Sequence, residues 1–183
     1  MSKELKTITI YGSSSSTIDS EYMAAAKRLG ELLALHNIDC INGGGRFGVM
    51  AAVTEGVLSQ GGKVTGIIPQ FMIDNGWLND SLTELIITAD MHQRKQLMAQ
   101  KADACIALPG GIGTLEELLE VMAWKQLELY RHPIVILNTN GFYDPLFAML
   151  KKAESEHFMR HERKDLWTVA ATPEEAIKRL IES

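Results

Sequence analysis

No stretch of this 183-residue sequence approaches the ~20 consecutive apolar residues that a membrane-spanning helix needs. Basic residues are also few, with 18 lysines and arginines against 23 aspartates and glutamates, and the net charge of −5 argues against binding to a nucleic-acid backbone. The two cysteines, Cys40 and Cys105, lie in apolar runs and form no Cys-x-x-Cys pair. We therefore expect buried thiols in a reducing compartment, and neither a membrane nor a nucleic acid as partner.

Sequence signals for several common chemistries are missing as well. The histidines are scattered without metal-ligand spacing, and neither a Gly-x4-Gly-Lys-Ser/Thr phosphate loop nor a Gly-x-Ser-x-Gly nucleophile turn occurs. We expect no metal and no cofactor. Polar residues 1–6 lead directly into an apolar run, which indicates no signal peptide and predicts a cytoplasmic location.

The sequence does contain a regular alternation of strand and helix patterns. Hydrophobic residues make up 46% and charged residues 22%, as expected for a packed core. Residues 1–183 should form a single α/β domain with a doubly wound, mostly parallel sheet of about seven strands and helices on both faces. Strands are predicted at residues 7–11, 38–42, 64–68, 82–88, 104–108, 134–137 and 166–170. Helices are predicted at residues 21–36, 47–60, 90–102, 114–130, 143–156 and from 173 onward.

A glycine-rich turn follows the fifth predicted strand and leads into a helix. Gly110, Gly111 and Gly113 would let the backbone approach a ligand without a side-chain clash. Thr114 and Glu117 would then sit at the helix N-terminus, where unpaired amides attract anions. The spacing of Thr114 and Glu117 also fits a capping box, but a capping box does not explain three glycines in four positions.

Two further turns follow predicted strands. Residues 43–48 (Gly-Gly-Gly-Arg-Phe-Gly) come after the second strand, and the polar turn that starts with Gly12 and Ser13 comes after the first. Ligands of such sheets bind at the carboxyl ends of strands, so we expect the three turns to meet at one edge and to hold a phosphorylated ligand, most simply a nucleotide. Residues 43–48 formally match the dinucleotide fingerprint. No acidic residue follows at the spacing that holds the ribose hydroxyls, which disfavours an NAD-dependent dehydrogenase.

The third predicted helix places Met91, Arg94 and Met98 on one face. A guanidinium on that apolar stripe is costly unless it pairs with an anion, which favours an Arg94 directed into a ligand cleft. The alternative is an arginine that reaches solvent at the edge of the stripe. Asp90 and Gln93 are most simply an N-capping pair.

The segment at residues 70–82 and two glutamates after the glycine turn allow a simple structural interpretation. Residues 70–82 are predicted to be irregular, and Phe71 and Trp77 within them could stack on a base or close a lid, although local packing explains them equally well. Glu116 and Glu120 of the helix after the glycine turn are expected to be solvated.

Three segments together resemble one known family. They are residues 43–50 (Gly-Gly-Gly-Arg-Phe-Gly-Val-Met), residues 91–95 (Met-His-Gln-Arg-Lys) and residues 109–117 (Pro-Gly-Gly-Ile-Gly-Thr-Leu-Glu-Glu). In this combination they resemble the LOG family, the cytokinin riboside 5′-monophosphate phosphoribohydrolases, whose members are often mislabelled lysine decarboxylases. The likeness runs from about Ile8 to the C-terminus and includes residues 141–145 (Gly-Phe-Tyr-Asp-Pro). No lysine is recognisably placed for a pyridoxal Schiff base, so the decarboxylase label lacks support.

The resemblance implies a Rossmann-like fold without a dinucleotide, and a homodimer with active sites near the subunit interface. It implies hydrolysis of the N-glycosidic bond of a purine nucleoside 5′-monophosphate, of the AMP or N6-modified adenine type, to free base and ribose 5-phosphate. The family's catalytic arginine and glutamate fall on Arg94 and Glu117. With the turns above, the candidate substrate-binding residues are Gly12, Ser13, Gly43, Gly44, Gly45, Met91, Arg94, Lys95, Gly110, Gly111, Ile112, Gly113, Thr114, Leu115, Glu116 and Glu117.

Hydrolysis of this bond develops positive charge on the ribose ring and negative charge on the departing purine. We expect Glu117 to stabilise the cation and to orient or deprotonate the attacking water, and helix-end amides to keep it ionised. We expect Arg94 to bind the phosphate or to polarise a ligand oxygen, because a guanidinium keeps its proton. The main alternative is a non-catalytic carrier of a nucleotide or related cofactor, which needs the glycine turns but not Glu117.

Overall fold

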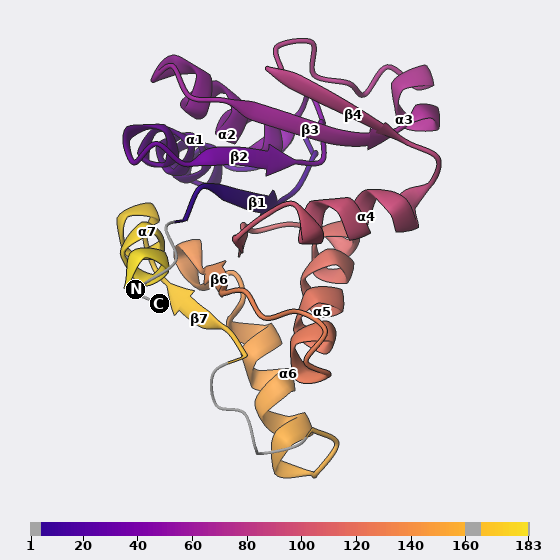
Figure 1. Ribbon diagram of the computed structural model, residues 1–183. Coiled ribbons are helices and arrows are strands. Elements are labelled where there is room, and N and C mark those ends of the chain that lie inside the picture. Colours follow the sequence, from indigo (N-terminus) through magenta and orange to yellow (C-terminus); the bar gives the residue numbers. More distant parts are fainter. Residues whose placement is uncertain (1–4, 160–165, 183) are drawn as a thin grey trace.

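A parallel sheet forms the centre of the computed structural model, which describes residues 5–159 and 166–182 (Figure 1). Within these residues the sheet has seven strands in the order β4-β3-β2-β1-β5-β6-β7, and every pairing is parallel. The strands are β1 (Thr7–Tyr11), β2 (Asp39–Asn42), β3 (Val64–Pro69), β4 (Glu84–Thr88), β5 (Ala104–Ala107), β6 (Ile134–Leu137) and β7 (Thr168–Ala170). Residues 1–4, part of the polar N-terminus that predicted a cytoplasmic location, lie outside the described residues.

Helices cover both faces of this sheet. The helices are α1 (Ser20–Leu35), α2 (Gly48–Ser59), α3 (Gln70–Asp74), α4 (Met91–Gln100), α5 (Ile112–Gln126), α6 (Asp144–Ser155) and α7 (Pro173–Ile181), with a 3-10 turn η1 (Thr139–Gly141). The predicted doubly wound α/β architecture is confirmed, and each predicted strand segment contains a strand, of which β3 extends one residue further, to Pro69. The prediction that residues 70–82 are irregular was wrong for α3, where the Gln70 side chain donates to Asp74 one turn later at 2.8 Å. Hydrophobic periodicity does not reveal so short and local a helix.

The order of the strands reverses at β1. From β1 the chain adds β2, β3 and β4 on one side, and β5 then returns to the other side of β1. Such a reversal opens a crevice at the carboxyl ends of the flanking strands, where ligands of this architecture bind. The turns that begin at Gly12, Gly43 and Leu108 leave the neighbouring strands β1, β2 and β5. The predicted meeting of the three turns at one edge of the sheet is therefore confirmed.

Alternating side chains of the strands supply two apolar cores. Ile8 and Ile10 of β1 belong to the core that α1, α2 and α7 close, whereas Tyr11 belongs to the core that α4 and α5 close. Cys40 lies in the first core and Cys105 in the second, and both are free thiols, as predicted. The two-sided burial explains why β5 and β6, which are buried throughout, are wholly apolar.

Helices α1 and α2 approach each other closely because each has a glycine at the contact. A Cβ atom at Gly30 would lie 2.3 Å from the carbonyl oxygen of Val53, and one at Gly56 would lie 2.0 Å from the carbonyl oxygen of Lys27. Glycine weakens a helix interior by its flexibility. Here the missing side chains let the two backbones touch.

We expect Gly56→Ala to destabilise the protein by about 1–3 kcal/mol, because the added methyl group forces the two helices apart. Ala24 lies on the exposed face of α1, so Ala24→Ser should change the free energy of unfolding by less than about 0.5 kcal/mol. Urea unfolding followed by circular dichroism measures both variants. Equal stability of Gly56→Ala and the parent protein would contradict the close contact.

Candidate active site

Helix α4 carries the candidate arginine, and a reciprocal cap fixes its first turn. The Asp90 side chain accepts a hydrogen bond from the Gln93 amide at 2.8 Å, and the Gln93 side chain accepts one from the Ala89 amide at 2.8 Å. The predicted capping role of Asp90 and Gln93 is confirmed. Because this cap sets where α4 begins, it also sets the position of Arg94 at the edge of the sheet.

Arg94 is buried, with 4% of its surface exposed. Its Nε donates to the carbonyl oxygen of Ile67 at 3.0 Å, and its Nη1 donates to Glu117 Oε1 at 2.9 Å. Its Nη2 donates to the carbonyl oxygen of Gly43 at 3.5 Å. The alternative of an arginine that reaches solvent is therefore wrong, since three acceptors hold the guanidinium inside the protein. The expected pairing with an anion is confirmed, and the anion is the Glu117 carboxylate.

The glycine turn after β2 makes room for this guanidinium. A Cβ atom at Gly43 would lie 1.9 Å from Arg94 Nη2. Gly44 follows with a φ of +72°, and its amide donates to the side-chain oxygen of Asn42 at 2.9 Å. The turn was predicted to receive an anion, but the Gly44 amide already donates within the chain. Its clearest contribution is the space that Arg94 occupies.

The segment at residues 70–82 is tied to the same turn by its main chain. The Arg46 amide donates to the carbonyl oxygen of Trp77 at 3.0 Å, and the Asn79 amide donates to that of Gly44 at 2.9 Å. The side chains of Phe71 and Trp77 are exposed. Their role in stacking on a base or closing a lid stays a prediction.

Helix α5 begins at Ile112 rather than at Thr114, with Gly111 as N-cap and no side-chain capping bond. The capping-box interpretation of Thr114 and Glu117 is therefore wrong. Thr114 is the third helical residue and packs against Gly110, where a Cβ atom would lie 2.1 Å from its Oγ1. Gly110 is thus needed for packing within the chain.

The first turn of α5 faces open space. A Cβ atom at Gly111 or Gly113 would meet no atom of the described residues within 4 Å, and Ile112 between them is 88% exposed. Because no side chain caps the helix, its first amides are left to solvent or to an anion. This is the part of the predicted phosphate site that the geometry favours most.

Glu117 lies in the second turn of α5 and is 8% exposed. Burial raises the pKa of its carboxyl above the ordinary 4.5, and the charge of Arg94 opposes this rise. The expectation that helix-end amides keep Glu117 ionised is wrong, because the helix begins too early for Glu117 to reach them. The charge of Arg94, instead of the helix-end amides, favours the ionised form of Glu117.

Lys95 joins α4 to α5 beside this pair. Its Nζ donates to Glu120 Oε2 at 2.9 Å and also to a carboxylate oxygen of Glu116. Glu116 is exposed, as predicted, whereas Glu120 is half-buried. The sequence did not predict that both carboxylates bind the buried ammonium group of Lys95. Lys95 and Glu116, both substrate-binding candidates, are therefore already bonded to each other.

The serine turn after β1 packs on the start of α2. A Cβ atom at Gly12 would lie 2.6 Å from Val49 Cγ2, and the Ser13 carbonyl oxygen accepts from the Met50 amide at 3.4 Å. The Ser13 hydroxyl accepts from the Ser15 amide at 3.1 Å. These contacts hold the turn against the first residues of α2.

Two predicted site residues remain, and two residues at the site were not predicted. Met91 and Leu115 are half-buried, and Leu115 packs against the core below α5. The contribution of Ile67 was missed, because it acts through a main-chain carbonyl that leaves no signal in the sequence. Tyr143, from the Gly-Phe-Tyr-Asp-Pro segment, was also not proposed as a site residue, although its hydroxyl contacts the strand that leads into the glycine turn.

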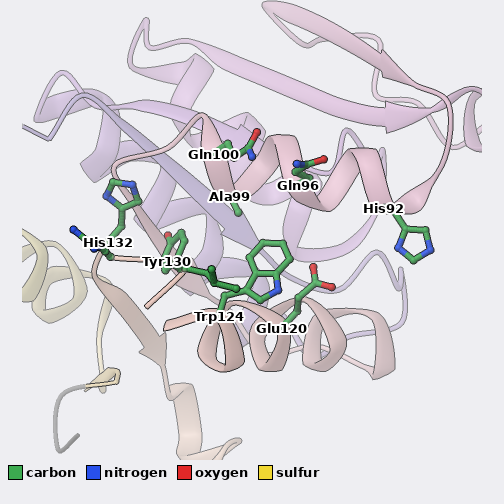
Figure 2. A pocket seen from close by; sticks show the side chains of 10 residues that line it. His92, Gln96, Ala99, Gln100, Glu120, Trp124, Tyr130 and His132 are labelled. Atoms are coloured by element: carbon green, nitrogen blue, oxygen red, sulfur yellow. The ribbon is translucent and has the colours of Figure 1, made fainter. Parts of the chain in front are cut away.

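A groove of about 650 Å³ runs between α4 and α5 (Figure 2). In Figure 2, Gln96 and Gln100 of α4 lie across from Trp124 and Glu120 of α5. The groove is further lined by His92, Ala99, Leu129, Tyr130, Arg131 and His132. Arg94 and Glu117 are not among these residues. Since Glu120 also binds Lys95, the groove adjoins the candidate site without containing it.

In residues 5–159 and 166–182, no helix has both the length and the apolar character needed to cross a membrane. Across the same part of the chain, no group of three or more His, Cys, Asp or Glu side chains is placed to hold a metal ion. The expectation that the protein uses no metal or cofactor stays a prediction.

The sequence is similar to those of known proteins over most of its length. A family model described as "Possible lysine decarboxylase" matches residues 50–180. A probable cytokinin riboside 5′-monophosphate phosphoribohydrolase of Oryza sativa subsp. japonica is 44% identical over 161 residues, which cover 88% of this chain and 66% of the rice protein. A cytokinin riboside 5′-monophosphate phosphoribohydrolase of Arabidopsis thaliana is 41% identical over 175 residues, which cover 96% of this chain and 81% of the plant protein.

The fold also has a known counterpart. The molybdenum cofactor binding protein of the phototrophic bacterium Rippkaea orientalis matches with a TM-score of 0.75 at 23% identity, covering 99% of this chain and 98% of that protein. At this identity the likeness shows a shared fold and leaves the chemistry to the residues of the site.

We expect Arg94→Met to destabilise the protein by about 3–5 kcal/mol at pH 8, because Glu117 becomes a buried charge without its partner. Without Arg94 the pKa of Glu117 rises further, so the folded state binds a proton that the unfolded state releases. The loss should therefore be smaller at pH 5, by up to about 1.4 kcal/mol for each pH unit between the two pKa values.

Urea unfolding of Arg94→Met at pH 5 and pH 8 tests this expectation. The double variant Arg94→Met/Glu117→Gln is the control, since its neutral amide should remove the pH dependence that the single variant shows. An equal loss of stability in the single variant at both pH values would mean that Glu117 does not depend on Arg94.

Proposed function

We propose, because this chain belongs to the LOG family of cytokinin riboside 5′-monophosphate phosphoribohydrolases, that it hydrolyses the N-glycosidic bond of purine nucleoside 5′-monophosphates. The products are the free base and ribose 5-phosphate. The observation that carries this proposal is the buried pair of Arg94 and Glu117, beside a helix that has no side-chain cap, at the carboxyl edge of the sheet. A protein that only carries a nucleotide does not need a buried carboxylate at this place.

The phosphate of the substrate binds at the first turn of α5 in this proposal. Gly111 and Gly113 leave the backbone uncovered, and the helix dipole favours an anion there. The serine turn that starts at Gly12 borders the same crevice and offers hydroxyl groups. Arg94, which is bound to Glu117, supplies a positive charge at this edge of the sheet, and it polarises a phosphate or ribose oxygen.

Glu117 acts on the ribose ring. As the bond between the anomeric carbon and the base nitrogen lengthens, the carboxylate stabilises the positive charge of the ring and accepts a proton from the attacking water. The hydroxyl of that water joins the anomeric carbon, and the base leaves with the bonding electrons and takes up a proton. Burial places Glu117 in a medium of low dielectric constant, where its charge acts most strongly.

Lysine decarboxylation fits the residues poorly. A Schiff base with pyridoxal phosphate requires an uncharged lysine amine. Lys95, the buried lysine at the site, is bound by the carboxylates of Glu116 and Glu120, which stabilise its charged form.

We expect Glu117→Gln to keep the fold and the binding of AMP but to lose turnover by about 10²- to 10³-fold, because the amide cannot stabilise the ribose cation. Chromatography of AMP and of N6-modified adenosine monophosphates after incubation with the protein measures adenine-type base and ribose 5-phosphate. Glu120→Gln, on the same helix but bonded to Lys95, is the control and should keep most of the turnover. Wild-type turnover in Glu117→Gln would reject the assignment, and release of no base by the parent protein from any of these nucleotides would favour a carrier.

We also infer that the protein is a cytoplasmic homodimer whose catalytic domain comprises the whole sheet. The buried thiols of Cys40 and Cys105 suit a reducing compartment, and burial raises the pKa of each to about 12, which keeps them unreactive. The apolar residues beside the α4–α5 groove support a partner on that side: Leu127 and Leu129 are both largely exposed.

We expect Leu129→Glu to convert the dimer to a monomer, because a charge on this apolar surface opposes its burial against a second copy. Sedimentation velocity measures the mass of each species. Leu35, which is exposed at the end of α1, gives the matched control, and Leu35→Glu should remain dimeric. A dimer that survives Leu129→Glu would place the interface elsewhere.

A further inference from the structure

The Gly-Phe-Tyr-Asp-Pro segment at residues 141–145 has no role in the chemistry above, yet its tyrosine reaches the site. Tyr143 lies between η1 and α6 and is 1% exposed. Its hydroxyl donates a hydrogen bond of 2.6 Å to the carbonyl oxygen of Leu108. Tyr143 and Leu108 are 35 residues apart in the sequence, so the fold has brought this bond together.

Leu108 is the last residue that the sheet holds before the glycine turn. Its amide donates to the carbonyl oxygen of Tyr11 in β1 at 2.8 Å. The ladder between β5 and β6 ends one residue earlier, at Ala107 and Ile136. The Leu108 carbonyl therefore lies beyond the ladder, and Tyr143 supplies its hydrogen bond. The next residue, Pro109, has no amide hydrogen that could anchor the turn.

Tyr143 is itself held in place by its neighbours. Its amide donates to Asn138 Oδ1 at 2.7 Å, and Asn138 Nδ2 donates to Asp144 Oδ1 at 2.8 Å. The Asn138 amide donates to the carbonyl oxygen of Ala170, which joins this cluster to β7. Gly141 turns the chain with a φ of +69°. These contacts fix the backbone at Tyr143, and the phenol extends from there to Leu108.

The surroundings of the Tyr143 hydroxyl keep it protonated, so that it can donate a hydrogen bond. Burial raises the pKa of Tyr143, and the negative charge of Glu117 raises it further.

We propose that Tyr143 is a positioning residue that fixes the glycine turn after β5, and with it the α5 amides that receive the substrate phosphate. This inference rests on the proposed function for the identity of the ligand. Glu117 has its own support in Arg94, which is bound to Ile67 and Gly43. Loss of the Tyr143 hydroxyl should therefore weaken binding of the phosphoribosyl group and leave the chemical step nearly unchanged.

The variant Tyr143→Phe removes the hydroxyl and keeps the ring. Tyr130→Phe is its matched control, because Tyr130 is equally a buried tyrosine, lies beside the Cys105 thiol, and among the described residues makes no hydrogen bond of standard geometry through its hydroxyl. We expect Tyr143→Phe to raise KM for AMP and Kd for ribose 5-phosphate about tenfold, which is about 1.4 kcal/mol. We expect kcat to change less than about threefold, and Tyr130→Phe to change none of these constants.

A purely structural role would lower the amount of folded protein and hence kcat, with KM unchanged, and that result would overturn the proposal. Asn138→Ala, which removes the acceptor of the Tyr143 amide, should raise KM in the same way but less.

Calorimetric titration with ribose 5-phosphate tests the inference even if no nucleotide is hydrolysed. Hydrogen exchange at residues 110–114 of the free protein needs no ligand: faster exchange in Tyr143→Phe than in Tyr130→Phe supports the anchor, and equal exchange overturns it whatever the activity.

Discussion

The buried pair of Arg94 and Glu117 is the interaction on which the site depends. Removing a guanidinium and a carboxylate from water costs several kcal/mol for each ion, and a single ion pair often fails to offset that cost. Here the guanidinium has further acceptors, the main-chain oxygens of Ile67 and Gly43. Replacing a buried ion pair by well-packed apolar side chains is often neutral or stabilising, so the pair by itself is weak evidence for a contribution to stability.

Helix α4 presents two cations in succession and directs them to different parts of the fold. Neighbouring helical residues are about 100° apart around the axis. Arg94 therefore reaches the strand ends and Glu117, while Lys95 reaches Glu116 and Glu120 on the outer side of α5. The two contacts fix the distance and the rotation of α4 relative to α5. The positions of the sheet edge, the glycine turn and the α4–α5 groove relative to one another therefore depend on these two contacts.

The glycines of the site serve two different purposes. Gly43 and Gly110 make room for side chains of the same chain, those of Arg94 and Thr114. Gly111 borders open space instead, as does Gly113, so the backbone there is uncovered. The sequence does not distinguish the two kinds of glycine, because a run of glycines indicates that some group approaches the backbone closely but does not identify the group.

Local physics in the sequence determined the order of strands and helices, the two-sided burial of the sheet and the capping of α4 by Asp90 and Gln93. Periodicity and capping act over a few residues, so they are visible in the sequence. The family motifs added the candidates Arg94 and Glu117, but only the tertiary structure decided that they bind each other, since 23 residues and a strand separate them. It also decided that α5 begins at Ile112. Contacts made through main-chain oxygens belong to no residue type, which is why only folding revealed them.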